Sequence, residues 1–222
     1  MHLLTTEPAP GSIECGAIGG DIWLPEGVPV PACATCGRAM ALYFQLEVRP
    51  DFGLPFHAGS RLNVFCCPEH DDLALEQYSD QDRAVQATYG QQVHVHYSLM
   101  LVPPGLPLRH HGSEPRLLRR ALQALPAREE TEDHEYLGRR GSCNASKIGG
   151  LPSWFNYAVD LPCPCGGRLA FLCQVSEVDA GDWFLHGPRR VDHHWFLNGN
   201  QTFLMACDRQ CSVFSIIPVC DN

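Results

Sequence analysis

The sequence CATCGR at residues 33–38 organises this chain, because a weaker copy of it, CPCGGR, occurs at residues 163–168. Each stretch is a pair of closely spaced thiols followed by glycine and arginine. Two thiols brought together by a tight turn commonly form half of a structural zinc site. The first question is therefore whether one unit occurs twice in the chain.

Other landmarks occur in the same order around both thiol pairs. They are IGGDIW at 18–23 and IGGLPSW at 148–154, ALYFQLEV at 41–48 and AFLCQVSEV at 170–178, and LNVFC at 62–66 and FLMAC at 203–207. Because several landmarks in one order are hard to obtain by chance, we predict two repeats, at residues 17–72 and 143–222.

The composition favours a mainly β fold. Apolar residues make up 45% of the 222 residues and charged residues 18%, as in ordinary globular proteins. The 20 glycines and 18 prolines favour turns and short strands over long helices. We expect an α+β, mainly β protein, in which two pseudo-symmetric β-rich repeats, able to pack as one domain, flank a connecting segment at 73–142.

The hydrophobic pattern predicts individual elements. Apolar runs or alternation predict strands at 39–48, 62–67, 93–101 and 213–219. Short helices are predicted near the connecting segment, one capped by Asp71 and one opening at Ser113 and carrying the leucines of 117–125 on one face. Residues 1–16 show no apolar period and are predicted to be a loosely held lead-in.

The charge balance bears on partners. The formal net charge of -9 argues against nucleic acid, which needs a basic face. A basic protein partner fits better, since complementary charge steers association. The first residues lack the features of a signal peptide, and no apolar run is long enough for a bilayer, so a cytoplasmic protein without membrane contact is expected.

Eight residues form two candidate zinc-binding sets. In a reducing compartment the 12 cysteines favour metal ligands or buried thiols over disulfides. Each structural zinc ion takes four thiolate or imidazole ligands. The first predicted set is Cys33, Cys36, Cys66 and His70, and the second is Cys163, Cys165, Cys207 and Cys211.

Two alternatives stay open at these sites. Cys67 competes with Cys66 for the first set, and we prefer Cys66 because the repeat pairs it with Cys207. The thiols could also be inert, buried and reduced. We expect one or two zinc ions, and because four protein ligands fill each set, their role is structural.

The sequence contains no motif of a common enzyme class. It has no nucleophile elbow, phosphate loop or dinucleotide fingerprint. The competing hypothesis is a hydrolase or thiol-dependent enzyme that uses the groove between the repeats, with Cys143, His193 or His194 as candidates. His193 and His194 belong to a long insertion, at 179–194, that only the second repeat carries.

The motifs resemble two protein families. The first repeat, with its Gly19-Gly20, Trp23, the 33–38 stretch and VFCC at 64–67, is similar to the N-terminal part of the eukaryotic programmed cell death protein 2 family. KIGGLPSW at 147–154 and FLCQ at 171–174 resemble the bacterial YwqG-like domain of unknown function. The resemblance covers both repeats and leaves the middle of the chain unmatched.

The resemblance implies a β-rich, pseudo-twofold fold that holds another protein. The eukaryotic family acts as a dedicated chaperone for a ribosomal protein, and YwqG-like genes occur near toxin systems. The sequence therefore leads us to expect a non-enzymatic, zinc-stabilised module that shields a specific protein partner, as an immunity protein or a dedicated chaperone does. That partner would be a basic toxin or client protein.

Overall fold

The computed structural model describes residues 1–70, 96–127, 145–154, 160–176 and 201–221. This part of the chain is mainly β, as predicted from the composition. Its strands are β1 (His2–Thr5), β2 (Ile13–Ile18), β3 (Asp21–Pro25), β4 (Ala41–Glu47), β5 (Arg61–Cys66), β6 (Tyr97–Val102), β7 (Leu108–Ser113), β8 (Arg120–Pro126), β9 (Lys147–Ile148), β10 (Leu169–Val175), β11 (Gln201–Cys207) and β12 (Ile216–Asp221), and the 3-10 helix η1 is Pro50–Phe52. No helix in the described segments is long and apolar enough to cross a membrane.

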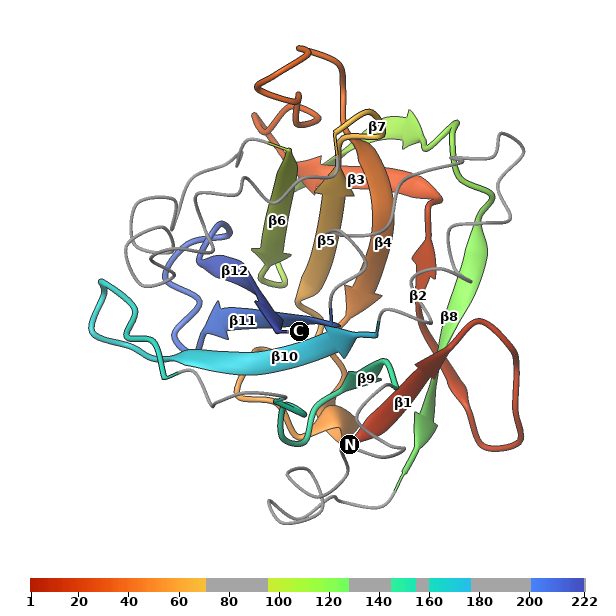
Figure 1. Ribbon diagram of the computed structural model, residues 1–222, viewed down its shortest axis with the longest axis vertical. Coiled ribbons are helices and arrows are strands. Elements are labelled where there is room, and N and C mark those ends of the chain that lie inside the picture. The colour runs from red at the N-terminus through yellow and green to blue at the C-terminus, as the bar shows by residue number, and fades with distance from the viewer. Residues whose placement is uncertain (71–95, 128–144, 155–159, 177–200, 222) are drawn as a thin grey trace.

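Ten of these strands form one curled sheet, in the order β12-β11-β10-β9-β1-β8-β2-β4-β5-β6. The sheet bends so strongly that β10 and β11 run across the direction of β4 and β5 in Figure 1. Its ends approach one another, since the N–H of Leu101 in β6 donates to the carbonyl of Val213, just before β12, at 2.8 Å. The result is a nearly closed, barrel-like sheet.

The core lies inside the curl, and smaller clusters cover the outside. Phe44, Leu62 and Leu99 contribute to the interior cluster from one end of the sheet, and Leu172 and Leu204 from the other. Strands β3 and β7 pair separately as a two-stranded ribbon over one end of β4, β5 and β6 (Figure 1). Under this ribbon, the outer faces of β4–β6 bury a second apolar cluster, which includes Cys33 and Cys67.

The hairpins β4–β5 and β10–β11 share local geometry. A β-bulge interrupts the first between Leu42 and Phe44 and the second between Phe171 and Cys173. Two glycines with positive φ precede each hairpin, and the first of each pair, Gly19 or Gly149, donates its N–H to the residue inside the bulge, at 3.0 and 3.1 Å. These positions are the ones that the sequence comparison paired.

Two sequence predictions of local structure are wrong. Residues 1–16 are not a loose lead-in, because β1 pairs with β8 and β9 and β2 pairs with β4 and β8. The helix predicted from Ser113 to 125 is absent: β7 ends at Ser113, residues 114–119 form an irregular connection, and most of β8 follows. Leu117, in the connection, and Leu122, in β8, both pack in the interior cluster, because pairing on both sides of β8 outweighs the helical pattern of the segment.

Other predicted strands are confirmed with changes. Strands β4 and β5 lie within the predicted ranges to within a residue. Strand β6 begins at Tyr97, and both of its faces are buried, since Leu99 joins the interior cluster and Met100 the outer one. The helix predicted near Asp71 and the insertion at 179–194 lie outside the described residues.

Candidate metal centres

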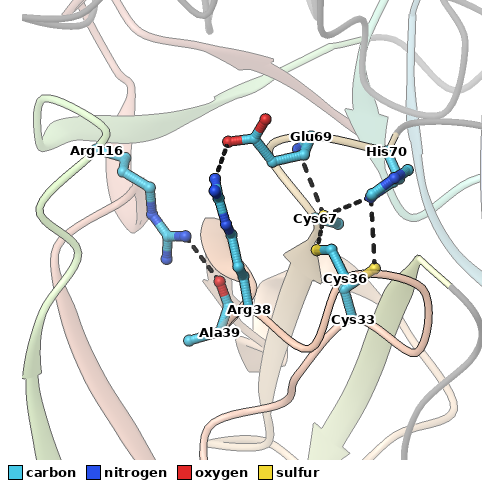
Figure 2. A network of polar contacts seen from close by, with 8 residues as sticks. All are labelled: Cys33, Cys36, Arg38, Ala39, Cys67, Glu69, His70 and Arg116. Atoms are coloured by element: carbon cyan, nitrogen blue, oxygen red, sulfur yellow. Dashed lines mark hydrogen bonds and ion pairs between the residues drawn. The ribbon is translucent and has the colours of Figure 1, made fainter.

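The first cluster brings together Cys33, Cys36, Cys67 and His70 (Figure 2). All its ligand atoms lie within 4.8 Å of one another. The Cys36 and Cys67 sulfurs are 3.7 Å apart, and His70 Nδ1 lies 3.7 Å from Cys33 Sγ and 3.5 Å from Cys67 Sγ. In a tetrahedral site with Zn–S bonds of about 2.3 Å, sulfurs are about 3.8 Å apart. The cluster therefore has the dimensions of a zinc site and is too open for a disulfide, whose sulfurs are about 2.05 Å apart.

A tight turn presents the first two thiols. The N–H of Cys33 donates to the carbonyl of Arg38 at 2.9 Å, and the N–H of Gly37 donates to the carbonyl of Cys33 at 2.8 Å. Gly37 has a φ of 69°, a conformation that glycine adopts without steric cost, so its place after the second thiol suits this turn. Cys67 follows the end of β5, and its N–H donates to the carbonyl of His96 at 2.7 Å.

The preference for Cys66 is wrong, because the structure brings Cys67 into the cluster instead. Neighbouring residues of a strand point to opposite faces. Cys66 packs in the interior cluster, whereas Cys67 lies with Cys33 on the outer side. The strand registers explain the error. Ala41 and Ala170 hold the same place in their hairpins, and they pair with Cys66 and Ala206. The next residues along, Cys67 and Cys207, therefore hold equivalent positions. The sequence comparison was out of register by one residue.

The second cluster contains all four predicted cysteines: Cys163, Cys165, Cys207 and Cys211. The Cys163 and Cys211 sulfurs are 3.6 Å apart, and those of Cys165 and Cys207 are 3.5 Å apart. Gly166 takes a φ of 81° and donates its N–H to the carbonyl of Cys163 at 2.9 Å, so this turn closes although only one residue separates its thiols. The two centres thus differ in ligands, with three thiols and an imidazole in the first and four thiols in the second.

The protein environment pulls the pKa values of these thiols apart. The backbone N–H of Gly167 lowers the pKa of Cys165 to about 7, with a smaller effect from Cys163. Burial raises the pKa of Cys67 to about 12 and also raises the pKa of Cys207. Without a cation, the second set would therefore mix thiol and thiolate near neutral pH. A bound dication favours the thiolate at every position.

Neighbouring charged residues anchor the first turn. Arg38 pairs with Glu69 at 2.6 Å, and Arg116 donates to the carbonyl of Ala39 at 2.7 Å (Figure 2). Arg116 also donates to the carbonyl of Met40, at 2.8 Å. Arg116 is itself held by the buried carboxylate of Glu114 at 2.7 Å. Sequence reasoning missed this support, because no spacing rule links residue 116 to the turn.

His96 also lies beside the first cluster. Its ring stacks on His70 with centroids 5.2 Å apart, and its Nε2 is 2.9 Å from the hydroxyl oxygen of Thr35. The imidazole of His96 therefore packs against a candidate ligand and helps to orient it.

Among the described residues, the other cysteines do not join either set. Cys15 and Cys173 are buried in the interior cluster, and burial raises the pKa of Cys15 to about 12 and that of Cys173 further. Such thiols stay protonated and are poor nucleophiles. The enzyme candidates Cys143, His193 and His194 lie outside the described residues.

No protein-family model matches this chain, and no curated protein matches it either. The chemistry of the two clusters thus stands on their geometry alone. Among the described residues, these two clusters are the groups of Cys, His, Asp and Glu arranged to hold a metal ion.

Proposed function

We propose that each cluster holds one structural zinc ion, and that the protein is a non-enzymatic module that binds and shields a specific protein partner. The observation that carries this proposal is the pair of four-ligand sets with tetrahedral dimensions. Four protein ligands leave no position for a substrate or an activated water, so a zinc ion held this way stabilises the fold.

We infer further that the two halves of the sheet are copies of one unit. The matching bulges, glycine pairs and thiol turns support this inference. So does the strand order, which reads β6-β5-β4-β2 from one edge and β12-β11-β10-β9 from the other. A duplicated scaffold with a metal ion in each half accounts for two structural sites in one small chain.

Three observations support a protein partner. The net charge of -9 favours a basic surface on that partner. The ribbon and the turn before β7 expose Trp23, Leu106 and Leu108, each at more than a third of its surface. Exposed aromatic and aliphatic residues of this kind are common in binding surfaces. The resemblance to dedicated chaperones and to domains encoded near toxin systems points the same way.

Metal analysis tests the zinc proposal. Untagged protein purified under reducing conditions should contain about two equivalents of zinc by mass spectrometry, and Cys33→Ser and Cys163→Ser should each contain about one. Less than one equivalent in the fresh unmodified protein would sink the two-site proposal. A loss of both ions in either single variant would show that the sites depend on each other.

Capture from native lysate tests the binding proposal. We expect the full chain, immobilised through a terminal tag, to retain one basic protein in stoichiometric amount. A matched variant, Trp23→Ser with Leu108→Ser, should retain much less of that protein while keeping both zinc ions. Repeated captures without a stoichiometric partner, or equal capture by the variant, would count against a partner that uses the ribbon.

A further inference from the structure

A pocket opens on the outer face of the sheet where β2 and β4 separate. The two strands pair only from Gly16–Leu46 to Ile18–Phe44, and a bulge at Cys15, between Glu14 and Gly16, displaces the beginning of β2. The space between them measures about 410 Å³. Trp23 of the ribbon lines the pocket and rests against His110, with ring centroids 4.7 Å apart. A pocket of this size accommodates a small molecule or the end of a peptide.

Three arginines line this pocket in a chain that carries a net charge of -9. Within the described residues, the side chain of Arg61 makes no hydrogen bond or ion pair. The Nε of Arg49 is shielded from solvent and has no hydrogen-bond acceptor, although a carboxylate oxygen of Asp51 lies 3.5 Å away. Arg119 contacts only Glu14, at 3.3 Å, in a pair whose side chains are both more than half exposed. The guanidinium of Arg61 is therefore available to an anion, whereas Arg49 and Arg119 each already face one carboxylate.

Most acidic side chains that line the pocket already interact with another group of the protein. Glu14 pairs with Arg119. Asp21 accepts a hydrogen bond from the hydroxyl of Ser113 and lies 3.6 Å from His110 Nε2. Glu47 stands opposite Arg61 in the strand register. Within the described residues, Glu47 is therefore the lining carboxylate left to oppose an anionic ligand, and the carboxylate of Asp51, beside Arg49, opposes it as well.

A second unsatisfied donor lies near the pocket, on β5, but does not line it. Asn63 is almost fully buried, and its Nδ2 has no acceptor. It stands opposite Gln45, a residue that lines the pocket. Buried donors nearly always have a partner. With Arg49 Nε, this makes two donors near one pocket that lack an acceptor, but both atoms are shielded from solvent, so a ligand would reach them only if neighbouring side chains moved.

The corresponding place in the other half is filled by the protein itself. Lys147 holds the position of Ala17, because it pairs with Gln174 as Ala17 pairs with Gln45. The side chain of Lys147 is fully buried, and its Nζ donates to the hydroxyl of Ser153 at 2.8 Å. Phe203 occupies the position of Asn63 and packs on Trp154 at 4.3 Å. Within the part of the chain that the structure describes, the open, arginine-lined pocket thus belongs to the first half.

We propose that this pocket binds a carboxylate attached to an aromatic or aliphatic group. Arg61 and Arg49 hold the carboxylate, and Trp23 packs against the apolar group. A peptide offers this chemistry at its C-terminal residue or at an acidic side chain beside an apolar one. The site does not depend on the zinc ions or on the proposed shielding of a partner.

Calorimetric titration with three defined probes tests the proposal. They are N-acetyl-leucyl-phenylalanine, its primary amide, and N-acetyl-leucyl-aspartic acid amide. We expect the free acid to bind about tenfold or more tightly than the neutral amide, because hydrogen bonds to charged groups are stronger. Tight binding of the aspartyl probe would assign the carboxylate to a side chain, and weak binding would assign it to the C-terminus. Equal binding of the free acid and its amide, or no binding of any probe, would overturn the proposal.

Matched variants locate the site. Arg61→Gln should weaken the free acid about tenfold and leave the amide unchanged, whereas Glu47→Gln should tighten the free acid. Arg168→Gln, which removes an exposed arginine in the other half, should change neither. Unaltered binding in both Arg61→Gln and Glu47→Gln would place the ligand elsewhere. If Arg61→Gln fails to fold, the opposite effect at Glu47 still decides the question.

Discussion

At the scale of single residues, the adjacent cysteines at the end of β5 show how one position decides a ligand set. Cys66 faces the interior and Cys67 faces the turn that carries Cys33. Their side chains have the same chemistry, so only the direction in which each points separates them. That direction follows from the register with β4, where Cys66 is paired with Ala41.

Substitution of these two cysteines should separate their roles. Cys67→Ser is expected to lower the zinc content from about two equivalents to about one, because serine is a poor zinc ligand. Cys66→Ser should keep both ions and lose only some stability, since it places a hydroxyl in the interior core. Mass spectrometry of the intact protein under native conditions measures both. Loss of an ion from Cys66→Ser alone would contradict the assignment.

His2 predicts a pH dependence of stability. Burial lowers its pKa below the ordinary value of 6.5, and its ring packs on Phe52 with centroids 4.9 Å apart. As the pH falls below 6.5, His2 becomes protonated in the unfolded chain while it stays neutral in the folded chain. The protein therefore loses stability as the pH falls from 6.5 through the folded-state pKa of His2.

A comparison with His2→Phe isolates this effect. The unmodified protein should lose more free energy of unfolding between pH 7 and pH 5 than the variant, as measured by urea denaturation at each pH. Parallel pH profiles for the two proteins would show that His2 does not titrate differently in the folded state.

At the scale of elements, the segment between β7 and β8 ties the first thiol turn to the sheet. Glu114 is buried, accepts from the N–H of Leu42 at 2.9 Å and pairs with Arg116. Arg116 in turn binds the carbonyls at the end of the turn. One carboxylate thus joins β4, the first thiol turn and the connection at residues 114–119, called the strap, which leads into β8.

Removal of that carboxylate should be costly. Glu114→Ala leaves a partly buried guanidinium and a buried amide without their acceptor, and we expect a loss of about 3–5 kcal/mol in the free energy of unfolding. Glu26→Ala, at an exposed acidic residue, should cost less than about 0.5 kcal/mol. Chemical denaturation measures both. A similar small effect for the two variants would show that the strap does not support the turn.

At the scale of the whole molecule, the sheet joins both halves into one body. Strands β1 and β8 pair at its centre, and β6 and the segment before β12 meet at its ends. The interior cluster draws residues from both halves. Neither half therefore has a complete core of its own.

Metal removal should then affect the protein as a unit. Chelation of zinc is expected to lower the melting temperature by about 10 °C or more, since structural zinc contributes several kcal/mol to folding. Cys36→Ser should shift one cooperative transition in calorimetry instead of splitting it. Two separate transitions, with only one of them shifted, would show that the halves unfold independently.

The local sequence alone was enough to predict the strands at 41–47 and 61–66, because their apolar runs suit only buried positions in a sheet. It also determined the thiol turns, because the glycine after each pair permits the required positive φ. The tertiary structure decided the rest. The segment 120–126 has a helical apolar pattern, and only its pairing with β1 and β2 makes it a strand. The choice of Cys67 and the nearness of Arg116 and His96 likewise depend on strand register, which joins residues far apart in the sequence and which no local spacing encodes.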